Sequence, residues 1–540
     1  MSSNKYKIQQ LISEGKLEKA SRLLEKQCQK KSKDPEVRMS LGLLYAQMGL
    51  YDRAEACLKI MLDLKPDKNL SVKGSNALAF LLVQKKNYSQ AIPLYQNSVS
   101  ISPQQSAIYF NLAGCLKKER HIDEAIEAYL CSLEINPEQY LAYREVAQMY
   151  EQTHQLDKSR EYAELAMKYS SNDIESTFLI AKLDAREKNY ASAKQGLQAL
   201  LEQNIPSQHR AIILLELGMV LDKVGEYEEA FKLITEGNKC LESLYVPHED
   251  EKGLENYRSE IADYINAYQE NSIDLWRDES LIDKSLNIIF LLGFPRSGTT
   301  LTEQILESHD AIIATHELPV LPRLVRKIDT VIGRKFNYPD DVSGLNKKEI
   351  NLLRQSYVLD MESFLNKKID KSKYLLDKLP LNITHIGFIS RVFPESKILL
   401  ALRDPRDVCL SCFMQNFTVN QAMRQYLDIY DTAKFYDVVM STYLKTKDVL
   451  SIDVLETRYE DIVDDLEKSA KRLLQYVGVE WDEKVLEFHK SAKKRMVYTP
   501  SYQGVIQPVY KGSISKWKNY EKHLYPALTY IDACLKQFKY

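Results

Sequence analysis

The chain contains no apolar stretch that approaches the roughly twenty residues needed to cross a bilayer, so we expect no membrane span. The N-terminal segment MSSNKYKIQQLISEGKLEKA mixes charged and apolar positions without a continuous apolar core, which predicts no signal peptide. An excess of one charge is also lacking. The 73 Lys and Arg residues nearly balance the 75 Asp and Glu residues, leaving a formal net charge of −2. No global basic field therefore favours nucleic acid as a partner.

Closely spaced cysteines are almost absent. Among the eight in the sequence, Cys409 and Cys412 are the one pair within a helical turn of each other. Neither a second pair nor a histidine at zinc-binding spacing accompanies them, so two thiols on one helix face are favoured over a redox or metal site. We therefore expect a reducing, cytoplasmic setting and no bound metal.

The 540 residues are enough for about two to four domains, and the first part of the chain repeats itself. A small residue that opens the second helix of each predicted helix pair recurs at spacings of 34 or 37 residues. These marker residues are Ala20, Ala54, Ala91, Ala125, Ser159, Ala193 and Ala230. The period is that of the tetratricopeptide repeat (TPR), in which two antiparallel helices touch at the small residue. We expect an all-α, right-handed solenoid of about seven pairs over residues 1–244, with three-residue insertions before the third and last copies.

The groove of such a solenoid has two interpretations. It holds a peptide, a protein or another acceptor, or the array is a spacer or dimerisation module, because the repeat fixes a shape and not a ligand. A homodimer stays open for the same reason. Residues 245–284 form a polar connector with one amphipathic helix around 254–268, which we expect to cap the apolar end of the array.

The second half opens with a strand, a glycine-bounded loop and a helix. The apolar run Ile288–Leu292 predicts a buried strand, GFPRSGTT follows from Gly293, and the next apolar residues have helical spacing. In this arrangement, successive backbone N–H groups and a helix N-terminus face one anion. The candidate anion ligands are Pro295, Arg296, Ser297, Gly298, Thr299 and Thr300.

One position separates this loop from that of a nucleoside triphosphatase. Gly293 and Gly298 have the G-x-x-x-x-G spacing, but Thr299 stands where a triphosphatase has the lysine that reaches the β- and γ-phosphates. The charge lies within the loop instead, at Arg296. The sequence therefore favours a 5′-phosphosulfate over a triphosphate, with a chance turn between strand and helix as the alternative.

PRSGTT after an apolar strand resembles the 5′-phosphosulfate loop of sulfotransferases that use 3′-phosphoadenosine 5′-phosphosulfate (PAPS) and release adenosine 3′,5′-bisphosphate. ALRDPRDVCLSCF, which follows another predicted strand, resembles the segment of that family that binds the nucleotide 3′-phosphate. The resemblance implies Arg403 and Ser411 as ligands, and a guanidinium with a hydroxyl suits a phosphate dianion. The alternative is a surface turn in which the arginines of RDPRD pair with its aspartates.

Three predicted strands end in charged or glycine-rich segments, namely GFPRSGTT, DKLP and RDPRD. Apolar strands that alternate with helices predict a parallel sheet covered on both faces, and ligands bind such sheets at the carboxyl ends of the strands. We therefore expect an α/β domain over residues 285–540 with a P-loop-like site.

The chain resembles the protein-tyrosine sulfotransferases and bacterial enzymes that join TPR repeats to the same domain. The resemblance covers the whole architecture, and the motifs of about residues 285–520. It implies Glu317 as the catalytic base and Lys378 as the group that neutralises charge on the departing phosphate. It also implies nucleotide contacts from Tyr459, Ser501 and Lys516.

These assignments have alternatives. Glu317 also suits a carboxylate near the start of a helix over 318–325, and His316 also suits a base because its unperturbed pKa is near 7. Lys378 also suits a surface lysine paired with Asp377. Two departures from the family concern specificity. Gln415 replaces a second nucleotide-binding arginine, and Pro319 replaces an arginine near the acceptor peptide, so a protein tyrosine, a glycan and a small phenol stay open as the hydroxyl acceptor.

Two other functions remain as alternatives. A P-loop kinase or triphosphatase requires a lysine beside Gly298, and a TPR scaffold with an inactive domain would have lost Glu317 or Lys378. Every motif matched to nucleotide or chemistry lies after Leu286. We therefore expect the repeats to select the acceptor and the second half to handle PAPS.

Overall fold

The computed structural model describes residues 2–31, 33–245, 253–269, 276, 281, 286–493, 509 and 511–540. The chain divides into two compact units, Met1–Leu183 and Asp184–Tyr540. This division falls inside the predicted repeat array, so the last repeat helices belong to the same unit as the sheet. The boundaries that the sequence suggests at residues 244 and 284 stay predictions.

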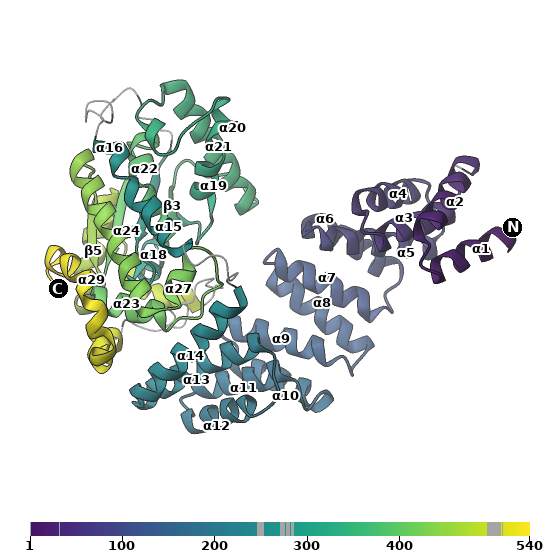
Figure 1. Cartoon of the computed structure of the whole chain (residues 1–540), viewed down its shortest axis with the longest axis horizontal. Helices are drawn as coiled ribbons and strands as arrows, with labels where there is room; N and C mark the ends of the chain where they lie inside the picture. The colour runs from purple at the N-terminus through teal and green to yellow at the C-terminus, as the bar shows by residue number, and fades with distance from the viewer. Residues whose placement is uncertain are drawn as a thin grey trace. The chain divides into compact units, whose positions relative to one another are not determined.

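Consecutive helices fill the repeat region (Figure 1). Their bounds are α1 (Ser2–Ser13), α2 (Leu17–Lys30), α3 (Pro35–Gln47), α4 (Tyr51–Asp63), α5 (Lys68–Gln84), α6 (Tyr88–Ile101), α7 (Ser106–Lys118), α8 (Ile122–Ile135), α9 (Tyr140–Gln152), α10 (Leu156–Tyr169), α11 (Ile174–Arg186), α12 (Tyr190–Leu201), α13 (Ser207–Val224) and α14 (Tyr227–Tyr245). Each marker residue, from Ala20 to Ala230, occupies the fourth position of the second helix in its pair and is 0% exposed. The small side chain is required there because the paired helices leave no room for a larger one.

The two predicted insertions lengthen helices. The first helices of most pairs, such as α3 and α7, have 13 residues, whereas α5 has 17 and α13 has 18. The extra residues therefore extend the first helix of the third and seventh pairs and leave the pairing intact. None of the helices in the described residues is long and apolar enough to cross a membrane.

A five-stranded parallel sheet forms the centre of the second half. Its strands lie in the order β2 (Ile312–Ala314), β3 (Tyr374–Lys378), β1 (Ile288–Gly293), β4 (Lys397–Leu402) and β5 (Leu455–Arg458). The register places Leu291 beside Lys378 and Gly293 beside Ala401. Because the strands are parallel, the loop after Gly293, Lys378 and Arg403 all leave the same edge of the sheet.

Helices cover both faces of the sheet. Their bounds are α18 (Thr299–Glu307), α19 (Val320–Arg326), α20 (Ile328–Ile332), α21 (Lys347–Leu365), α22 (Ile386–Val392), α23 (Pro405–Phe413), α24 (Ile429–Leu450), α25 (Tyr459–Asp464), α26 (Leu466–Val477), α27 (Phe488–Lys493) and α29 (Glu521–Phe538), with 3₁₀ helices η2 (Asp340–Val342), η3 (Pro380–His385), η4 (Met423–Tyr426), η5 (Glu483–Glu487), η6 (Lys511–Ser513) and η7 (Lys516–Tyr520). Phe290 and Leu292 of β1 pack in one core with α21, α22 and α24, and Ile289 and Leu291 pack in another with α18 and α26. A strand buried on both faces needs a continuous apolar run, which the sequence has. The predicted fold, helical TPR repeats followed by a parallel α/β domain, is confirmed.

The connector helix packs on the sheet domain. It is present as α15 (Gly253–Asp263) followed by α16 (Asn266–Gln269), and both lie against α24. Arg258 of α15 donates to Gln425 Oε1 at 2.8 Å and to Asp431 Oδ1 at 3.0 Å. These contacts join the helix to the second unit, and its expected role as a cap on the repeats stays a prediction.

The close helix contacts of the repeats give a test. A Cβ added to Gly42 of α3 would lie 2.9 Å from Leu58 Cγ, whereas a Cβ on Gly114 of α7 would meet only the Tyr129 hydroxyl at 3.8 Å. Gly42→Ala should destabilise by about 1–3 kcal/mol because it overpacks the pair. Gly114→Ala, the matched control, should be neutral or stabilising by up to about 1 kcal/mol through helix propensity. Urea unfolding of the full chain measures both, and equal stabilities would contradict this packing.

Candidate active site

The loop between β1 and α18 is held tightly by two glycines. Gly293 has φ +155°, and a Cβ there would lie 2.7 Å from Ser297 Oγ and 2.8 Å from the Ala401 carbonyl. Gly298 has φ +103°, and its Cβ would lie 3.0 Å from the Tyr459 ring. The loop is therefore wedged between β4 and the start of α25, at the N-terminus of α18.

The hydroxyl-bearing residues of the loop are buried. Ser297, Thr299 and Thr300 are 3 to 5% exposed. The Ser297 Oγ has no hydrogen-bond partner within the described part of the chain, and a buried hydroxyl without a partner is costly. An anion with several oxygens, seated on the loop at the helix N-terminus, would satisfy this hydroxyl.

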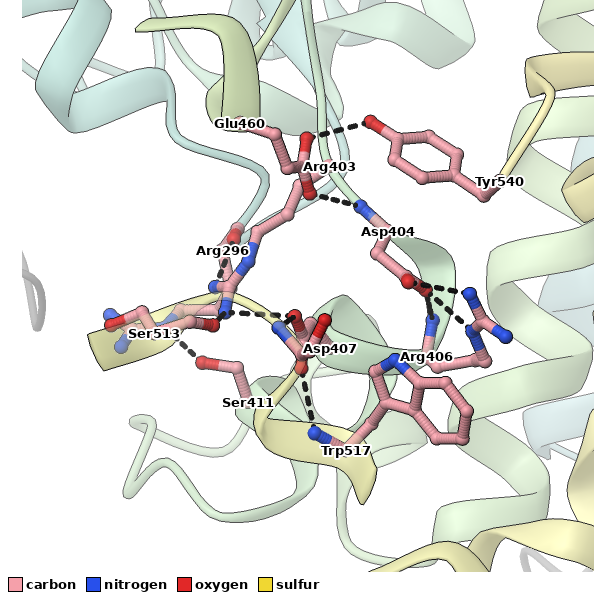
Figure 2. Close-up of polar contacts among 11 residues, drawn as sticks. Arg296, Arg403, Asp404, Arg406, Asp407, Ser411, Glu460, Ser513, Trp517 and Tyr540 are labelled. Atoms are coloured by element: carbon pink, nitrogen blue, oxygen red, sulfur yellow. Dashed lines mark hydrogen bonds and ion pairs between the residues drawn. The ribbon is translucent and has the colours of Figure 1, made fainter. Parts of the chain in front are cut away.

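The two segments that resemble nucleotide-binding motifs contact each other. Arg296 Nε donates to Ser411 Oγ at 2.9 Å, and Arg403 Nη1 donates to the Arg296 carbonyl at 3.3 Å (Figure 2). Arg296 has φ +70°, an unfavourable conformation for a residue with a side chain, and these bonds hold it there. The structure therefore places Arg296 of the loop in contact with Arg403 and Ser411.

The cysteine pair supports this loop and is buried. Cys412 Sγ donates to the Pro295 carbonyl at 3.3 Å. Burial raises the pKa of the Cys409 and Cys412 thiols well above the usual value, so both stay protonated. All eight cysteines are free. The pair is a structural part of α23, as its position on a helix face indicates.

The two arginines of RDPRD have different partners (Figure 2). Arg406 is held by both oxygens of Asp404, at 2.7 and 2.8 Å, and lies 4.0 Å over the Trp517 ring. Arg403 Nε has no partner among the described residues, and Asp407 lies 3.7 Å from its Nη2. The alternative predicted arginine–aspartate pairs on a surface turn. The pairs are present, but the turn is not on the surface, because Arg403 and both aspartates are less than 9% exposed.

A C-terminal segment closes over Arg403. Arg403 Nη2 donates to the Ser513 carbonyl, and Asp407 accepts the backbone N–H groups of Ser515 and Trp517 at 2.8 Å each. Lys516 lies between these two residues, and its Nζ lies 2.7 Å from Asp222 Oδ2 of α13. Burial lowers the pKa of Lys516. The predicted nucleotide lysine is therefore near Arg403 but is paired with a repeat residue.

Of the two remaining residues predicted to contact the nucleotide, the structure describes Tyr459 but not Ser501. Tyr459 lies beside Gly298, and the Arg403 guanidinium lies 5.0 Å over its ring. Ser501 lies outside the described residues. Gln415 follows the last turn of α23, and Pro319 precedes the first turn of α19.

A buried lysine marks the other side of the loop. Lys378, the last residue of β3, is 0% exposed, and its Nζ lies 2.7 Å from Glu317 Oε1 and 3.2 Å from Glu303 Oε2. Burial lowers the pKa of Lys378, but the two carboxylates outweigh burial and raise it above the usual value. Asp377 points elsewhere and accepts from the Tyr357 hydroxyl at 2.6 Å. The alternative of a surface pair between Lys378 and Asp377 is therefore wrong.

Glu303 was not predicted from the sequence. It is completely buried on α18, where burial raises the pKa of its carboxyl but Lys378 and His316 together lower it. The sequence of α18, TTLTEQILE, has apolar residues at three of its nine positions, so it gives no signal that Glu303 is buried. A buried carboxylate requires a buried cation as a partner.

His316 is tied to carboxylates. Its Nδ1 lies 3.4 Å from Glu303 Oε1, and its Nε2 lies 3.7 Å from Glu307 Oε1. Burial lowers the pKa of His316, but the bond to Glu303 leads the effects that raise it above the usual value. A protonated imidazole is a poor acceptor for a proton, so this environment favours Glu317 over His316 as a base.

Glu317 does not cap the following helix. The helix α19 begins at Val320, its N-cap residue is Pro319, and no side chain caps it. Glu317 is instead partly exposed, at 34%, with one oxygen on Lys378. Among the described residues, no group of three or more His, Cys, Asp or Glu side chains is arranged to hold a metal ion.

The raised pKa of His316 predicts a pH dependence of stability. The stabilisation from a protonated His316 is fully present below the unfolded pKa of about 6.5 and is lost as the pH rises through the higher folded value. His316→Asn should therefore destabilise the protein more at pH 6 than at pH 9. Thermal unfolding at both pH values measures this, and an equal loss would show that His316 is neutral when folded.

Comparison with known proteins finds relatives of both halves of the chain. Residues 288–483 match the sulfotransferase family model, residues 11–72 and 82–148 match a tetratricopeptide repeat model, and residues 136–270 match a tetratricopeptide repeat-like domain. An uncharacterized protein of Aquifex aeolicus is 28% identical over 354 residues, which are 64% of this chain and 44% of that protein. Protein-tyrosine sulfotransferase 2 of Gallus gallus is 26% identical over 242 residues, which are 43% of this chain and 64% of the enzyme.

The chain thus spans less than two thirds of the length of these two relatives. Among solved structures, MamA is similar with a TM-score of 0.29 and 23% identity, over 30% of this chain and 93% of MamA. The family match begins at β1 and ends after the last strand of the sheet, and it contains the loop, Lys378 and Arg403. Residues 288–483 therefore form a sulfotransferase-family domain, homologous to the protein-tyrosine sulfotransferases, that follows tetratricopeptide repeats.

Proposed function

We propose that this protein transfers a sulfuryl group from PAPS to the hydroxyl of an acceptor, with Glu317 as general base. The observation that carries the proposal is the buried Lys378 ammonium, held beside Glu317 at the sheet edge from which the phosphate-type loop also leaves. A buried cation beside a partly exposed carboxylate is costly to maintain for structure alone. It suits a reaction in which one oxygen loses a proton while another gains negative charge.

The residues present fit the nucleotide. Ser297 has a buried hydroxyl without a partner, and Arg403 Nε is likewise unpartnered among the described residues. Residues 295–300 would hold the 5′-phosphosulfate, and Arg403, Ser411 and Lys516 would hold the 3′-phosphate, with Tyr459 alongside. Ser501 remains a proposed contact from the sequence.

Each group has a role in an in-line displacement. Bound PAPS would supply an activated sulfuryl group. Glu317 takes the proton of the acceptor hydroxyl as that oxygen attacks sulfur. Lys378 neutralises the charge that develops on the departing phosphate oxygen, and Arg296 and the loop N–H groups assist. Glu303 keeps Lys378 protonated when Glu317 is occupied with the acceptor.

The acceptor is proposed to be a protein tyrosine. The named relatives are protein-tyrosine sulfotransferases, and tetratricopeptide repeats indicate protein partners. Pro319, which departs from the expected arginine, keeps a glycan or a small phenol as competing acceptors. From the sequence we also propose a cytoplasmic location, and a homodimer is an alternative to a monomer.

The other functions are less well supported. A P-loop kinase or triphosphatase needs a lysine beside Gly298, and that position is Thr299, at the first position of α18. A scaffold with an inactive domain would have no use for a buried Lys378 between two carboxylates. Labelled sulfate transferred from PAPS to pools of peptides, glycans and phenols separates these possibilities, and no transfer to any pool would contradict the proposal.

The base assignment predicts a separation of binding from turnover. Glu317→Gln should leave the affinity for adenosine 3′,5′-bisphosphate nearly unchanged and lower turnover by on the order of 10²–10⁴-fold, the usual contribution of a general base. His316→Ala is the matched control, because its imidazole is the other candidate base. A large loss in the histidine variant with normal turnover of the glutamine variant would reverse the assignment.

The 3′-phosphate assignment predicts a ligand-dependent effect. Arg403→Ala should weaken adenosine 3′,5′-bisphosphate by roughly 1.5–3 kcal/mol, because it removes a charge-assisted bond. The loss for adenosine 5′-monophosphate, which lacks the 3′-phosphate, should be much smaller. Calorimetric titration of both nucleotides checks this, and equal losses would mean that Arg403 contacts something else.

A further inference from the structure

The last repeat pair, α13 and α14, is part of the sheet domain. Ala211 and Ile234 of this pair share a buried core with Phe290 of β1. Asn238 Nδ2 donates to the Phe413 carbonyl at 2.9 Å, and Phe231 packs on the Phe413 ring with centroids 5.0 Å apart. Phe413 ends α23, the helix that carries Ser411, so these repeat helices support the nucleotide side of the site.

One residue of this pair, Asp222, contacts the segment that lies over Arg403. Asp222, in the last turn of α13, is 6% exposed. Its Oδ2 lies 2.7 Å from Lys516 Nζ, and its Oδ1 accepts from the Tyr520 hydroxyl at 2.7 Å. Both oxygens of a buried carboxylate are therefore used by η7, on the segment that closes over Arg403.

The same segment is fixed from its other side. Asp407 accepts from the backbone of Ser515 and Trp517, and Ser515 has φ +57°, a conformation that is unfavourable for a residue with a side chain. Two buried carboxylates, Asp407 from the sheet domain and Asp222 from the repeats, thus bind neighbouring residues of one short segment. Of these two carboxylates, Asp222 is the one that contacts the side chain of Lys516.

The charges around Lys516 explain why its contact with Asp222 matters for the position of the ammonium. Burial lowers the pKa of Lys516, the neighbouring Lys223 and Arg403 cations lower it further, and the Asp222 carboxylate opposes them. An ammonium has three donors, so Lys516 can keep its bond to Asp222 while donating to a phosphate. The carboxylate fixes the direction of a side chain that otherwise has several free rotatable bonds.

We propose that Asp222 is a positioning residue of the nucleotide site, which holds Lys516 in place for the 3′-phosphate. The inference rests on the proposed function, because that function assigns the 3′-phosphate to this segment. It also differs from the expectation from the sequence that the second half alone handles the nucleotide. Handling of the nucleotide is shared by the last repeat, and a chain beginning after α14 would lack a group that shapes the site.

The test uses the full chain and two nucleotides. Asp222→Asn should weaken adenosine 3′,5′-bisphosphate by about tenfold, the scale of one charge-assisted hydrogen bond, and leave adenosine 5′-monophosphate within about twofold. Lys516→Met should have the same effect. The double variant should bind no more weakly than Lys516→Met alone, because Asp222 acts through Lys516.

The matched control is Glu228→Gln on α14. Glu228 pairs with Lys522 and His523 of α29 at 2.5 and 2.8 Å, so it joins the last repeat pair to the helix after η7 without touching the segment over Arg403. This variant should bind both nucleotides as the wild type does. If Asp222→Asn does not fold, Tyr520→Phe removes the bond to the other oxygen of Asp222 and should weaken the bisphosphate alone by roughly threefold.

The outcomes separate this inference from the proposed function. Equal weakening of both nucleotides by Asp222→Asn, or no weakening of either, would overturn the positioning role while leaving the sulfotransferase proposal intact. A wild-type protein that binds neither nucleotide would overturn both.

Discussion

The arrangement of the site depends on one buried ammonium. Lys378 has no exposed surface, and moving such a cation out of water costs several kcal/mol unless carboxylates surround it. Glu303 and Glu317 meet that requirement from two different segments, one inside α18 and one after β2. Holding the lysine charged thus fixes the position of the loop helix relative to the strand edge. It also holds the side chain of Glu317, which is 34% exposed, beside the ammonium.

The strand order brings the rest of the chemistry to this point. β1 lies between β3 and β4, so the loop between β1 and α18 is flanked by Lys378 on one side and by Arg403 on the other. Arg296 links the two sides, since its backbone lies in the loop and its guanidinium bonds Ser411 of α23. The last repeat pair reaches the same region through α13, whose Asp222 contacts Lys516 of the segment over Arg403.

The features that the sequence predicts are local or periodic. The buried small residues from Ala20 to Ala230 follow a fixed spacing, and β1 with its two glycines is contiguous in sequence. Lys378 and Arg403 could be placed together because parallel strands end at one edge. The burial of these two residues could not be predicted. It depends on partners such as Glu303, which is 75 positions from Lys378 and follows no repeating pattern. The pair of Asp222 and Lys516 is more distant still. The start of α19 at Val320 also differs from the expected 318, because Pro319 takes the N-cap position.

The most direct measurement is the structure of the full chain with adenosine 3′,5′-bisphosphate bound. The account predicts the 5′-phosphate on the loop N–H groups and Ser297, within hydrogen-bond distance of Lys378, and the 3′-phosphate on Arg403 and Lys516. Lys516 should keep its contact with Asp222 in that complex. A bisphosphate bound elsewhere, or bound in the loop with Lys378 still closed between Glu303 and Glu317 and out of reach of the phosphate, would contradict it.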